Sequence, residues 1–336
     1  MTKRTGIRDV ARHAGVSIST VSKALNRPDG VNPQLVARVR SAADELGYVP
    51  LEAARQLRVR RSGLLGMTVI NIGNPFFADL MAGAEDAVAG AGMRVLVGNS
   101  DDDVTKERDH LELFERVQVE GALISPFGDA GAWIDRLRAR GIPVVLVDTM
   151  DDAGVLPSVS LDDIAGGRMA AGHLIDIGRR RLAFLGAREE VRQVRERLQG
   201  AREAVADHPG VELEVTWCER TTARVGQELG VRIAAMDAAD RPDGIITTND
   251  HMGCGVVHGL VTAGVRVPED IAVIGYDDIE FASIAAVPLS SIRQPAREMG
   301  RRAGELLMRH IAGETDGTVT QIVFQPELVT RASTIG

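Results

Sequence analysis

Short amphipathic segments dominate the first 50 residues of the chain. Apolar positions recur at helical spacing over residues 7–14, 18–25 and about 33–46, and Gly15 lies at the corner between the first two segments. Glycine turns a chain sharply at positive φ, and helices this short are unstable alone in water, so we expect three helices packed on one another. A short helix pair with a glycine corner, followed by a third helix, is typical of a helix-turn-helix.

The pattern changes after residue 63, where continuous apolar runs alternate with amphipathic segments. The runs at residues 64–72, 93–99, 121–125 and 143–148 predict strands, and the segments at 77–91, 105–117 and 133–140 predict helices. A second series predicts strands at 182–186, 244–250, 271–278 and 321–325 and helices at 164–177, 192–206, 222–236, 251–263 and 295–311. Continuous apolar strands between helices indicate parallel sheets covered on both faces, here in two similar α/β lobes.

Charge divides the chain in the same place. Residues 1–61 hold 12 Lys or Arg against 5 Asp or Glu, a net charge of +7, whereas the remainder holds 27 against 42, a net charge of −15. A small basic head on a large acidic body suggests that only the head meets a polyanion, although a solvated basic face is the plainer alternative.

Composition adds little to this picture. The start of the chain has no apolar signal region, and Cys218 and Cys254 are too few for a disulfide framework, so a cytoplasmic protein without a membrane span is expected.

Small hydroxyl side chains are common on the expected outward face of the second predicted helix, which carries Ser17, Ile18, Ser19, Thr20, Ser22 and Lys23. Such a face can lie in the major groove of DNA, where short hydroxyls bind phosphates and the helix N-terminus favours anions. A plain αα-hairpin with polar caps is the alternative reading.

The stretch "YVPLEAARQLRVRRSGLLG" connects the head to the body. Residues 53–57 could form a helix of barely two turns, with Leu57 surrounded by Arg55, Arg58, Arg60 and Arg61. A leucine among arginines makes sense if it wedges a base step in the minor groove. A flexible basic linker with an incidental leucine is the alternative.

Together the stretches "IRDVARHAGVSISTVSKALN", "ELGYVP", "AARQLR", "RSGLLG" and "NPFFADL" resemble the LacI/GalR family of bacterial transcription regulators over essentially the full chain. The resemblance implies that Ile18, Ser19 and Lys23 contact base edges, that Ser17, Thr20, Ser22 and Asn26 contact phosphates, and that a hinge helix including Ala53, Leu57 and Arg58 orders on operator DNA. One departure is Leu51, which stands where the family commonly has Asn.

For the body, the resemblance implies a periplasmic-binding-protein-like core. Its chain crosses between lobes near Asp163, Ser291 and Phe324. The expected organisation is a head at residues 1–50, a hinge at 51–62, lobe one at about 63–163 and 292–323, and lobe two at about 164–291 and 324–336.

Polar residues follow the predicted strands at Asn74, Ser125, Asp148, Asn249–Asp250 and Asp277–Asp278. Ligands sit at the carboxyl ends of parallel strands, so these residues should ring one cleft suited to a polyhydroxylated effector. The resemblance implies as effector contacts Phe76, Phe77, Ser125, Asp148, Asp162, Arg197, Asn249, Asp277 and Gln294.

Plainer readings remain for parts of this set. Asp277–Asp278 could be a turn after a strand, and Arg197 could be a solvated helix charge. The family often places an aromatic ring near Thr221, but this chain has only 3% aromatic residues, so a stacking platform is missing or is supplied by Trp133 or Trp217.

Other chemistry finds little support in the sequence. His251, Cys254 and His258 share a helical face but lack a fourth metal ligand. No cofactor motif is present, and no acid, base and nucleophile set indicates an enzyme.

The sequence therefore predicts a DNA-binding regulator, most simply a repressor, that acts as a homodimer on palindromic operator DNA under control of a small effector. A solute-binding protein or an enzyme built on the same body is the rival reading.

Overall fold

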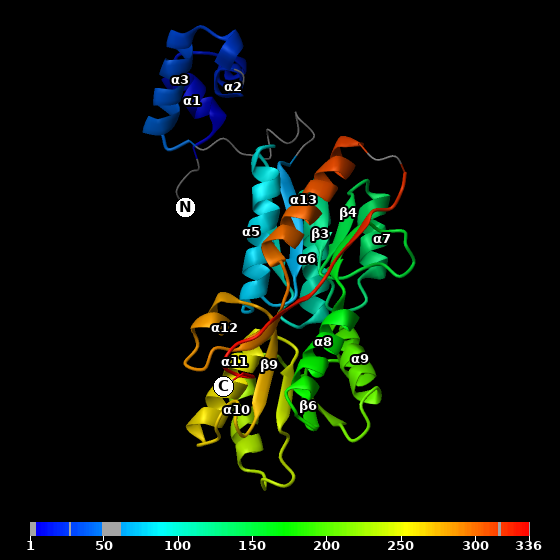
Figure 1. Ribbon diagram of the computed structural model, residues 1–336. Helices are drawn as coiled ribbons and strands as arrows, with labels where there is room; N and C mark the ends of the chain where they lie inside the picture. Colours follow the sequence, from blue (N-terminus) through cyan, green and yellow to red (C-terminus); the bar gives the residue numbers. More distant parts are fainter. Residues whose placement is uncertain (1–4, 27, 49–61, 315–316, 336) are drawn as a thin grey trace. The chain divides into compact units, whose positions relative to one another are not determined.

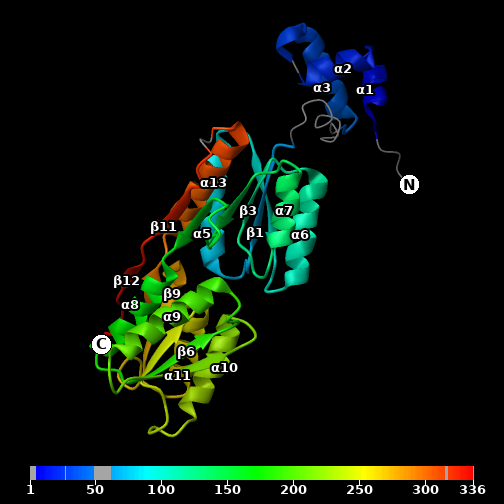
Figure 2. The ribbon, with the colours of Figure 1, turned by 90° about the vertical axis from the view of Figure 1, so that its right-hand side faces the viewer.

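The computed structural model describes residues 5–26, 28–48, 62–314 and 317–335. Its residues form two compact units, 1–61 and 62–336, called the head and the body. The body holds two α/β lobes, seen in Figures 1 and 2.

The head is a bundle of three helices, α1 (Ile7–His13), α2 (Ile18–Asn26) and α3 (Pro33–Glu45), with a short 3-10 turn, η1 (Pro28–Gly30), before α3. Gly15 makes the expected corner at a φ of +63°. The Ser17 hydroxyl accepts the Thr20 backbone N–H at 3.1 Å, and the Asn32 side chain caps α3 through the Gln34 N–H at 2.9 Å. Val10, Val21 and Val39 are fully buried where the helices meet, together with several alanines.

Lobe one contains a parallel sheet in the order β11-β5-β4-β3-β1-β2. The strands are β1 (Leu64–Val69), β2 (Arg94–Asn99), β3 (Gly121–Ile124), β4 (Val144–Val147), β5 (Ser158–Leu161) and β11 (Gln321–Phe324). Helices α5 (Pro75–Ala89) and α13 (Ala296–Ala312) pack side by side, and α6 (Val104–Val117) and α7 (Gly131–Ala139) lie on the opposite face of the sheet (Figure 2).

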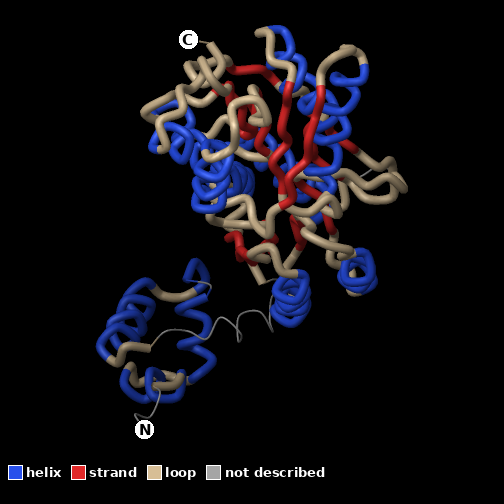
Figure 3. Tube along the Cα trace, turned by 90° about the horizontal axis from the view of Figure 1, so that it is seen from below, coloured by secondary structure: helices blue, strands red, loops and turns tan. Residues whose placement is uncertain are grey.

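Lobe two repeats this arrangement in the order β12-β10-β9-β8-β6-β7, in which only the β10–β12 pair is antiparallel. The strands are β6 (Arg181–Gly186), β7 (Glu212–Trp217), β8 (Gly244–Thr247), β9 (Ala272–Asp277), β10 (Ser290–Arg293) and β12 (Glu327–Val329). Helices α8 (Asp163–Asp176) and α9 (Arg192–Ala206) pack together, as do α10 (Ala223–Ala234) and α11 (Asp250–Thr262), and α12 (Glu280–Ile284) follows β9. Figure 3 shows helices on both sides of the strands.

The chain passes between the lobes three times, from β5 to α8, from β10 to α13 and from β11 to β12. These passages lie next to the residues near which the sequence placed crossovers, Asp163, Ser291 and Phe324. Three chain segments thus connect the lobes. In open parallel sheets ligands bind at the carboxyl ends of the strands, and residues from this end of both sheets line one cavity.

Glycines allow the paired helices to approach at backbone contact. A Cβ built on Gly167 of α8 would lie 1.9 Å from the Arg197 carbonyl oxygen of α9, and one on Gly300 of α13 would lie 1.9 Å from the Leu80 carbonyl oxygen of α5. The α10–α11 pair does the same through Gly255, whose Cβ would meet the Ala223 carbonyl oxygen at 2.0 Å. Side chains at these positions would force the helices apart.

Two sequence-based expectations were wrong. The pattern did not predict β5, β7, β10, β12 or α12, which are short or lie at sheet edges. Ser22 was placed on the outward face of α2, but it is buried, with 8% of its surface exposed. Successive residues of an α-helix are rotated by about 100°, which places Ser22 beside Leu25 and the buried Val21 around the helix. Ser22 therefore lies on the inward half of α2.

Candidate functional site

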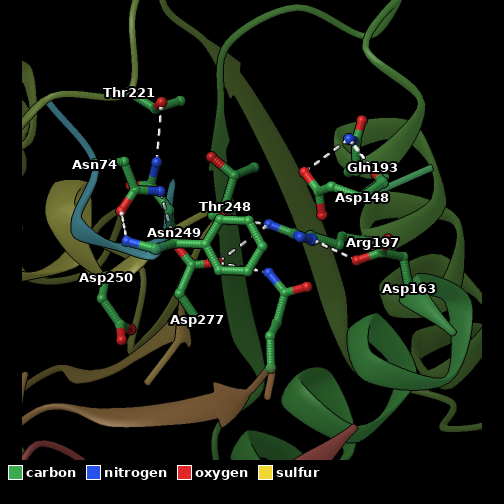
Figure 4. A network of polar contacts seen from close by, with 12 residues as sticks. Asn74, Asp148, Asp163, Gln193, Arg197, Thr221, Thr248, Asn249, Asp250 and Asp277 are labelled. Atoms are coloured by element: carbon green, nitrogen blue, oxygen red, sulfur yellow. Dashed lines mark hydrogen bonds and ion pairs between the residues drawn. The ribbon is translucent and has the colours of Figure 1, made fainter. Parts of the chain in front are cut away.

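Two asparagines mark corresponding positions in the two lobes. Asn74 is the N-cap of α5 after β1, and Asn249 is the N-cap of α11 after β8; their side chains accept the N–H of Phe76 at 3.2 Å and of Met252 at 2.8 Å. Capping fixes each side-chain oxygen, and the amide nitrogens are then directed at other partners. Asn74 Nδ2 donates to Asp277 Oδ2 at 2.8 Å across the lobes, and Asn249 Nδ2 donates to Thr221 Oγ1 at 3.0 Å (Figure 4).

Arg197 of α9 lies at the centre of this network, with 6% of its surface exposed. Its Nε donates to Asp163 Oδ1 at 2.7 Å and its Nη1 to the Thr248 carbonyl at 2.6 Å (Figure 4). Its guanidinium stacks on the Tyr276 ring at 3.7 Å from the centroid. Burial alone would lower the pKa of Arg197, but the carboxylates around it, Asp163 above all, raise it above its usual value, so the group stays charged. Arg197 is therefore not a solvated helix charge.

Asp277 is the last residue of β9, Asp278 follows it, and their side chains have different partners. Asp277 is buried and accepts Asn74 Nδ2 and, at 2.7 Å, Gln294 Nε2, while Arg197 Nη1 lies 4.0 Å from its Oδ1. Asp278 instead pairs with Arg293 at 2.7 Å and Arg331 at 2.6 Å. Burial raises the pKa of Asp277 to about 6, and Arg197 opposes that rise. Only Asp277 thus belongs to the cleft, and the pair cannot act as one catalytic dyad.

Asp148 at the end of β4 is the second cleft carboxyl. Gln193 Nε2 of α9 donates to its backbone carbonyl at 2.5 Å and to its Oδ2 at 2.9 Å (Figure 4). Its other oxygen, Oδ1, is buried without a hydrogen-bond partner. Burial raises the pKa of Asp148 to about 8, while Arg197 lowers it and Asp163 and Asp277 add to the rise.

Residues of both lobes enclose a cavity of about 80 Å³, called here the effector cleft. Its walls are Ile70, Asn71, Asn74, Phe76, Phe77, Asp102, Phe127, Asp148, Ala187, Val191, Gln193, Val194, Arg197, Thr221, Thr248, Asn249, His251, Asp277 and Gln294. Phe76 and Phe77 meet edge to face at a centroid separation of 5.1 Å. The lining thus combines two phenyl rings with a ring of polar groups.

Seven of the nine effector contacts expected from the sequence line this cavity. The other two do not: Ser125 is fully buried below it, and Asp162 caps α8 by accepting the Ala165 N–H at 2.9 Å. Sequence reasoning missed Gln193, Thr248, Thr221 and Asp102 as lining residues. The arginine-rich helix around Gln193 gave no sign of which of its residues face inward, whereas Thr248 directly precedes Asn249 and could have been found at the end of its strand.

Several side-chain oxygens of residues that line the effector cleft have no hydrogen-bond partner. Besides Asp148 Oδ1, the side-chain oxygens Gln193 Oε1, Gln294 Oε1 and Thr248 Oγ1 are buried without a hydrogen-bond partner. Buried polar atoms normally find partners, so these atoms await hydrogen-bond donors. Two carboxyls, Asp148 and Asp277, face one guanidinium that is already bound to Asp163. The cleft can therefore take a ligand rich in hydroxyl donors and opposes an anion.

The exposed side of α2 is the second candidate surface. Ile18 is 44% exposed, Ser19 and Lys23 are exposed, and Thr20 is half-buried. The Ser17 hydroxyl lies 2.8 Å from the hydroxyls of both Ser19 and Thr20, which clusters three hydroxyls at the N-terminus of the helix. This face offers the groups that phosphates and base edges bind.

Four of the DNA contacts expected from the sequence are not described. Ala53, Leu57 and Arg58 lie outside the described residues, and so does the side chain of Asn26. Their roles stay predictions.

Among the described residues, no group of three or more His, Cys, Asp or Glu side chains is placed to hold a metal ion. None of their helices combines the length and the hydropathy needed to cross a membrane.

Comparison with known proteins finds matches in both the head and the body. Residues 6–50 match the family model "Bacterial regulatory proteins, lacI family", and residues 171–334 match "Periplasmic binding protein-like domain". The PurR transcriptional repressor of Photobacterium profundum is 33% identical over 337 residues, covering 97% of this chain and 98% of that protein. The ribose operon repressor of Bacillus subtilis is 36% identical over 304 residues, covering 90% of each chain.

A solved structure, the complex of the transcriptional regulator CelR with cellobiose, superposes with a TM-score of 0.71 at 30% identity, covering 98% of this chain and 100% of that one. The likeness to these relatives extends from the helix-turn-helix through both lobes of the body. The chain belongs to the LacI family of bacterial regulatory proteins, DNA-binding transcriptional regulators that small-molecule effectors control.

Proposed function

We propose that this regulator is a homodimeric repressor of palindromic operator DNA, and that its effector is a neutral polyhydroxylated molecule about one sugar ring in size. The observation that carries the effector class is the set of four unpartnered acceptor atoms around Arg197 and Asp277. Each can accept a hydrogen bond from a ligand hydroxyl, and two phenyl rings cover an apolar ring face.

Charge supports a neutral effector over an anionic one. Asp163 already pairs with Arg197 at 2.7 Å, so the cleft has no free cation to balance a phosphate or a carboxylate. An added anion would face the buried carboxyls of Asp148 and Asp277, which oppose a second negative charge when they are ionised. Sugar phosphates and sugar acids should therefore bind far more weakly than the parent sugars.

Size supports a single ring. Drug-sized ligands occupy pockets of roughly 300–1,000 Å³, whereas the effector cleft measures about 80 Å³. Solved structures similar to this chain hold sugars of one and two rings: a LacI family regulator from Enterococcus faecium has bound ribose, and CelR has bound cellobiose. A sugar of one ring fits this cavity better than a sugar of two rings.

On DNA, the exposed hydroxyls of α2 and Lys23 support sequence-specific binding by the head. The head's charge of +7 supplies the attraction to phosphates. A two-fold pair of heads would read half-sites about one helical turn apart, roughly 10 bp.

Titration calorimetry with D-ribose, other monosaccharides, cellobiose and ribose 5-phosphate tests the effector class. We expect binding of at least one neutral monosaccharide and none of the phosphate. Asp277→Asn should weaken that binding at least tenfold, because buried charged hydrogen bonds are worth about 2–5 kcal/mol. Asp278→Asn, whose parent side chain pairs with Arg293 and Arg331 outside the cleft, is the matched control and should bind normally.

Binding to operator DNA in gel-shift assays should survive in both variants. Tight binding of ribose 5-phosphate, or an unchanged affinity in Asp277→Asn, would contradict this assignment of the cleft.

A further inference from the structure

One ion-pair cluster bridges the lobes at the margin of the effector cleft. Arg220, in the loop between β7 and α10, reaches Asp101 and Asp102, in the loop between β2 and α6. Its Nη2 contacts Asp101 Oδ1 and lies 3.3 Å from Asp102 Oδ2. Lys106 binds the other Asp101 oxygen at 2.7 Å, and Asn71 donates to Asp102 Oδ2 at 2.9 Å. Each loop follows the edge strand of its sheet, so the cluster lies where the two edges meet.

The acidic side of the cluster is held in a fixed shape. Asp101 and Asp102 both have positive φ, at 51° and 60°, a conformation that aspartate tolerates better than most residues. Asp103 then caps α6 by accepting the Thr105 N–H at 2.7 Å. The two carboxyls are thus placed by strand and helix rather than by the arginine, and they form a preorganised receptor for a cation from lobe two.

Both sides of the cluster continue into the effector cleft. Asp102 itself lines the cavity, and so does Thr221, the residue after Arg220. Thr221 is also bound by the capping asparagine Asn249 at 3.0 Å. Any separation of Arg220 from Asp102 therefore moves two walls of the site apart. At this position the sequence lacks the aromatic ring that the family resemblance led us to expect.

We propose that Arg220 and the Asp101–Asp102 pair form an electrostatic latch that closes the effector cleft and retains the effector. The inference rests on the proposed function for the identity of the occupant, but the latch itself is a property of the chain. Arg220 has 42% of its side chain exposed, so the contact exchanges with water and is screened by salt. The latch makes effector retention depend on ionic strength, although the effector is uncharged.

Arg220→Gln removes the charge and keeps most of the side chain. We expect effector dissociation to be about two- to fivefold faster, in line with measured exposed ion pairs. Raising salt from 50 to 500 mM should speed dissociation from the parent protein and leave the variant unaffected. Arg224→Gln is the matched control, because Arg224 is 87% exposed and its ion pair among the described residues is with Glu228 on the same helix. It should behave like the parent.

A second measurement needs no effector. In a background with Cys218→Ser and Cys254→Ser, spin labels at Asp109→Cys on α6 and Gln227→Cys on α10 report the separation of the two lobes. Both positions are exposed. The label separation should broaden toward longer distances in Arg220→Gln and, at high salt, in the parent.

The outcomes separate the two proposals. An unchanged label separation together with unchanged dissociation in Arg220→Gln overturns the latch. A wider separation in Arg220→Gln with no sugar bound by the parent protein supports the latch and overturns the proposed effector class. A change of equal size in Arg224→Gln overturns the latch, because it would show a general effect of lost charge.

Discussion

At the residue scale, aspartates at strand ends define the site. Asp148 and Asp277 both have positive φ, at 60° and 107°, where most side chains are strained. That conformation directs each carboxyl into the cleft instead of along its sheet face. Asparagine is among the few residues that tolerate such angles, so amide substitutions test charge without changing the backbone.

Asp148 should make the stability of the unliganded protein depend on pH. Its pKa is raised by burial to about 8, so below that pH the folded state holds a proton that the unfolded state releases. The stabilisation from this proton is complete below the unfolded pKa and is lost as the pH rises through about 8. Asp148→Asn lacks this titrating proton. As the pH rises from 6 to 8, the unfolding free energy of the parent should fall relative to that of Asp148→Asn by up to about 1.4 kcal/mol per pH unit.

Urea unfolding of both proteins across this range measures the difference. Groups that do not interact with Asp148 cancel in the comparison, because they are common to the two chains, whereas Asp163 and Asp277 interact with it and are part of the measured difference. A difference that does not change with pH would show that Asp148 is ionised throughout.

The same proton links effector binding to pH. Ligand hydroxyls donate to the ionised carboxylate, so the effector should bind more tightly as the pH rises toward 8 and no further above it.

At the element scale, backbone contact between helices positions the central arginine. Gly167 of α8 lies against the Arg197 carbonyl of α9, so a methyl group there must push α9 outward. Gly167→Ala should destabilise the protein by about 1–3 kcal/mol, as overpacking does, and should also weaken effector binding by displacing Arg197.

Gly172→Ala on the same helix is the control, since a Cβ there meets nothing within 4 Å. It should stabilise the fold by about 0.5–1 kcal/mol through helix propensity and leave effector affinity unchanged. Thermal unfolding and calorimetry on the pair check both statements. Equal behaviour of the two variants would contradict the role of close packing at Gly167.

The sequence predicted the long elements well because their apolar stripes are continuous. The sequence did not predict β7, because residues Glu212–Trp217 alternate between polar and apolar and the strands were predicted from mostly continuous apolar runs. It failed for β5 and β10 because serines occupy buried strand positions, such as Ser158 and Ser290. Local pattern does not show that a distant segment will bind a buried hydroxyl, as happens at Ser290, whose hydroxyl donates to the Arg331 carbonyl at 3.0 Å.

The candidate site was predictable where it follows strand ends, as at Asn74 and Asp277. It was not predictable where a helix side chain or an opposing lobe completes it, as at Gln193 and Asp102. Those positions depend on how two lobes pack, which no window of sequence contains.

At the scale of the whole molecule, the chain separates attraction to DNA from recognition of the effector. The head carries +7 and the remainder −15, so the acidic body is repelled by the same phosphates that attract the head. DNA therefore has little electrostatic reason to contact the effector-binding lobes. The two activities should accordingly respond to salt by different mechanisms.

Operator affinity should fall steeply with salt. If the heads of a dimer neutralise 6–10 phosphates, affinity drops by about 10³–10⁵ between 50 and 200 mM salt, with a slope near −0.9 per phosphate. Effector affinity over the same range should change only by the few-fold factor expected of exposed ion pairs. Fluorescence anisotropy with operator and random duplexes, beside calorimetry on the effector, measures both in one protein.

Lys23 connects this argument to specificity. It lies on the exposed side of α2, so Lys23→Gln should reduce the preference for operator over random duplex by about 1–3 kcal/mol, the value of a base-edge contact. Arg12→Gln on α1, whose parent residue is 80% exposed and 3.4 Å from Asp9, should change binding to both duplexes alike. Loss of a phosphate contact weakens binding to all DNA sequences equally. An unchanged preference in Lys23→Gln would therefore show that Lys23 contacts the DNA backbone and not a base edge.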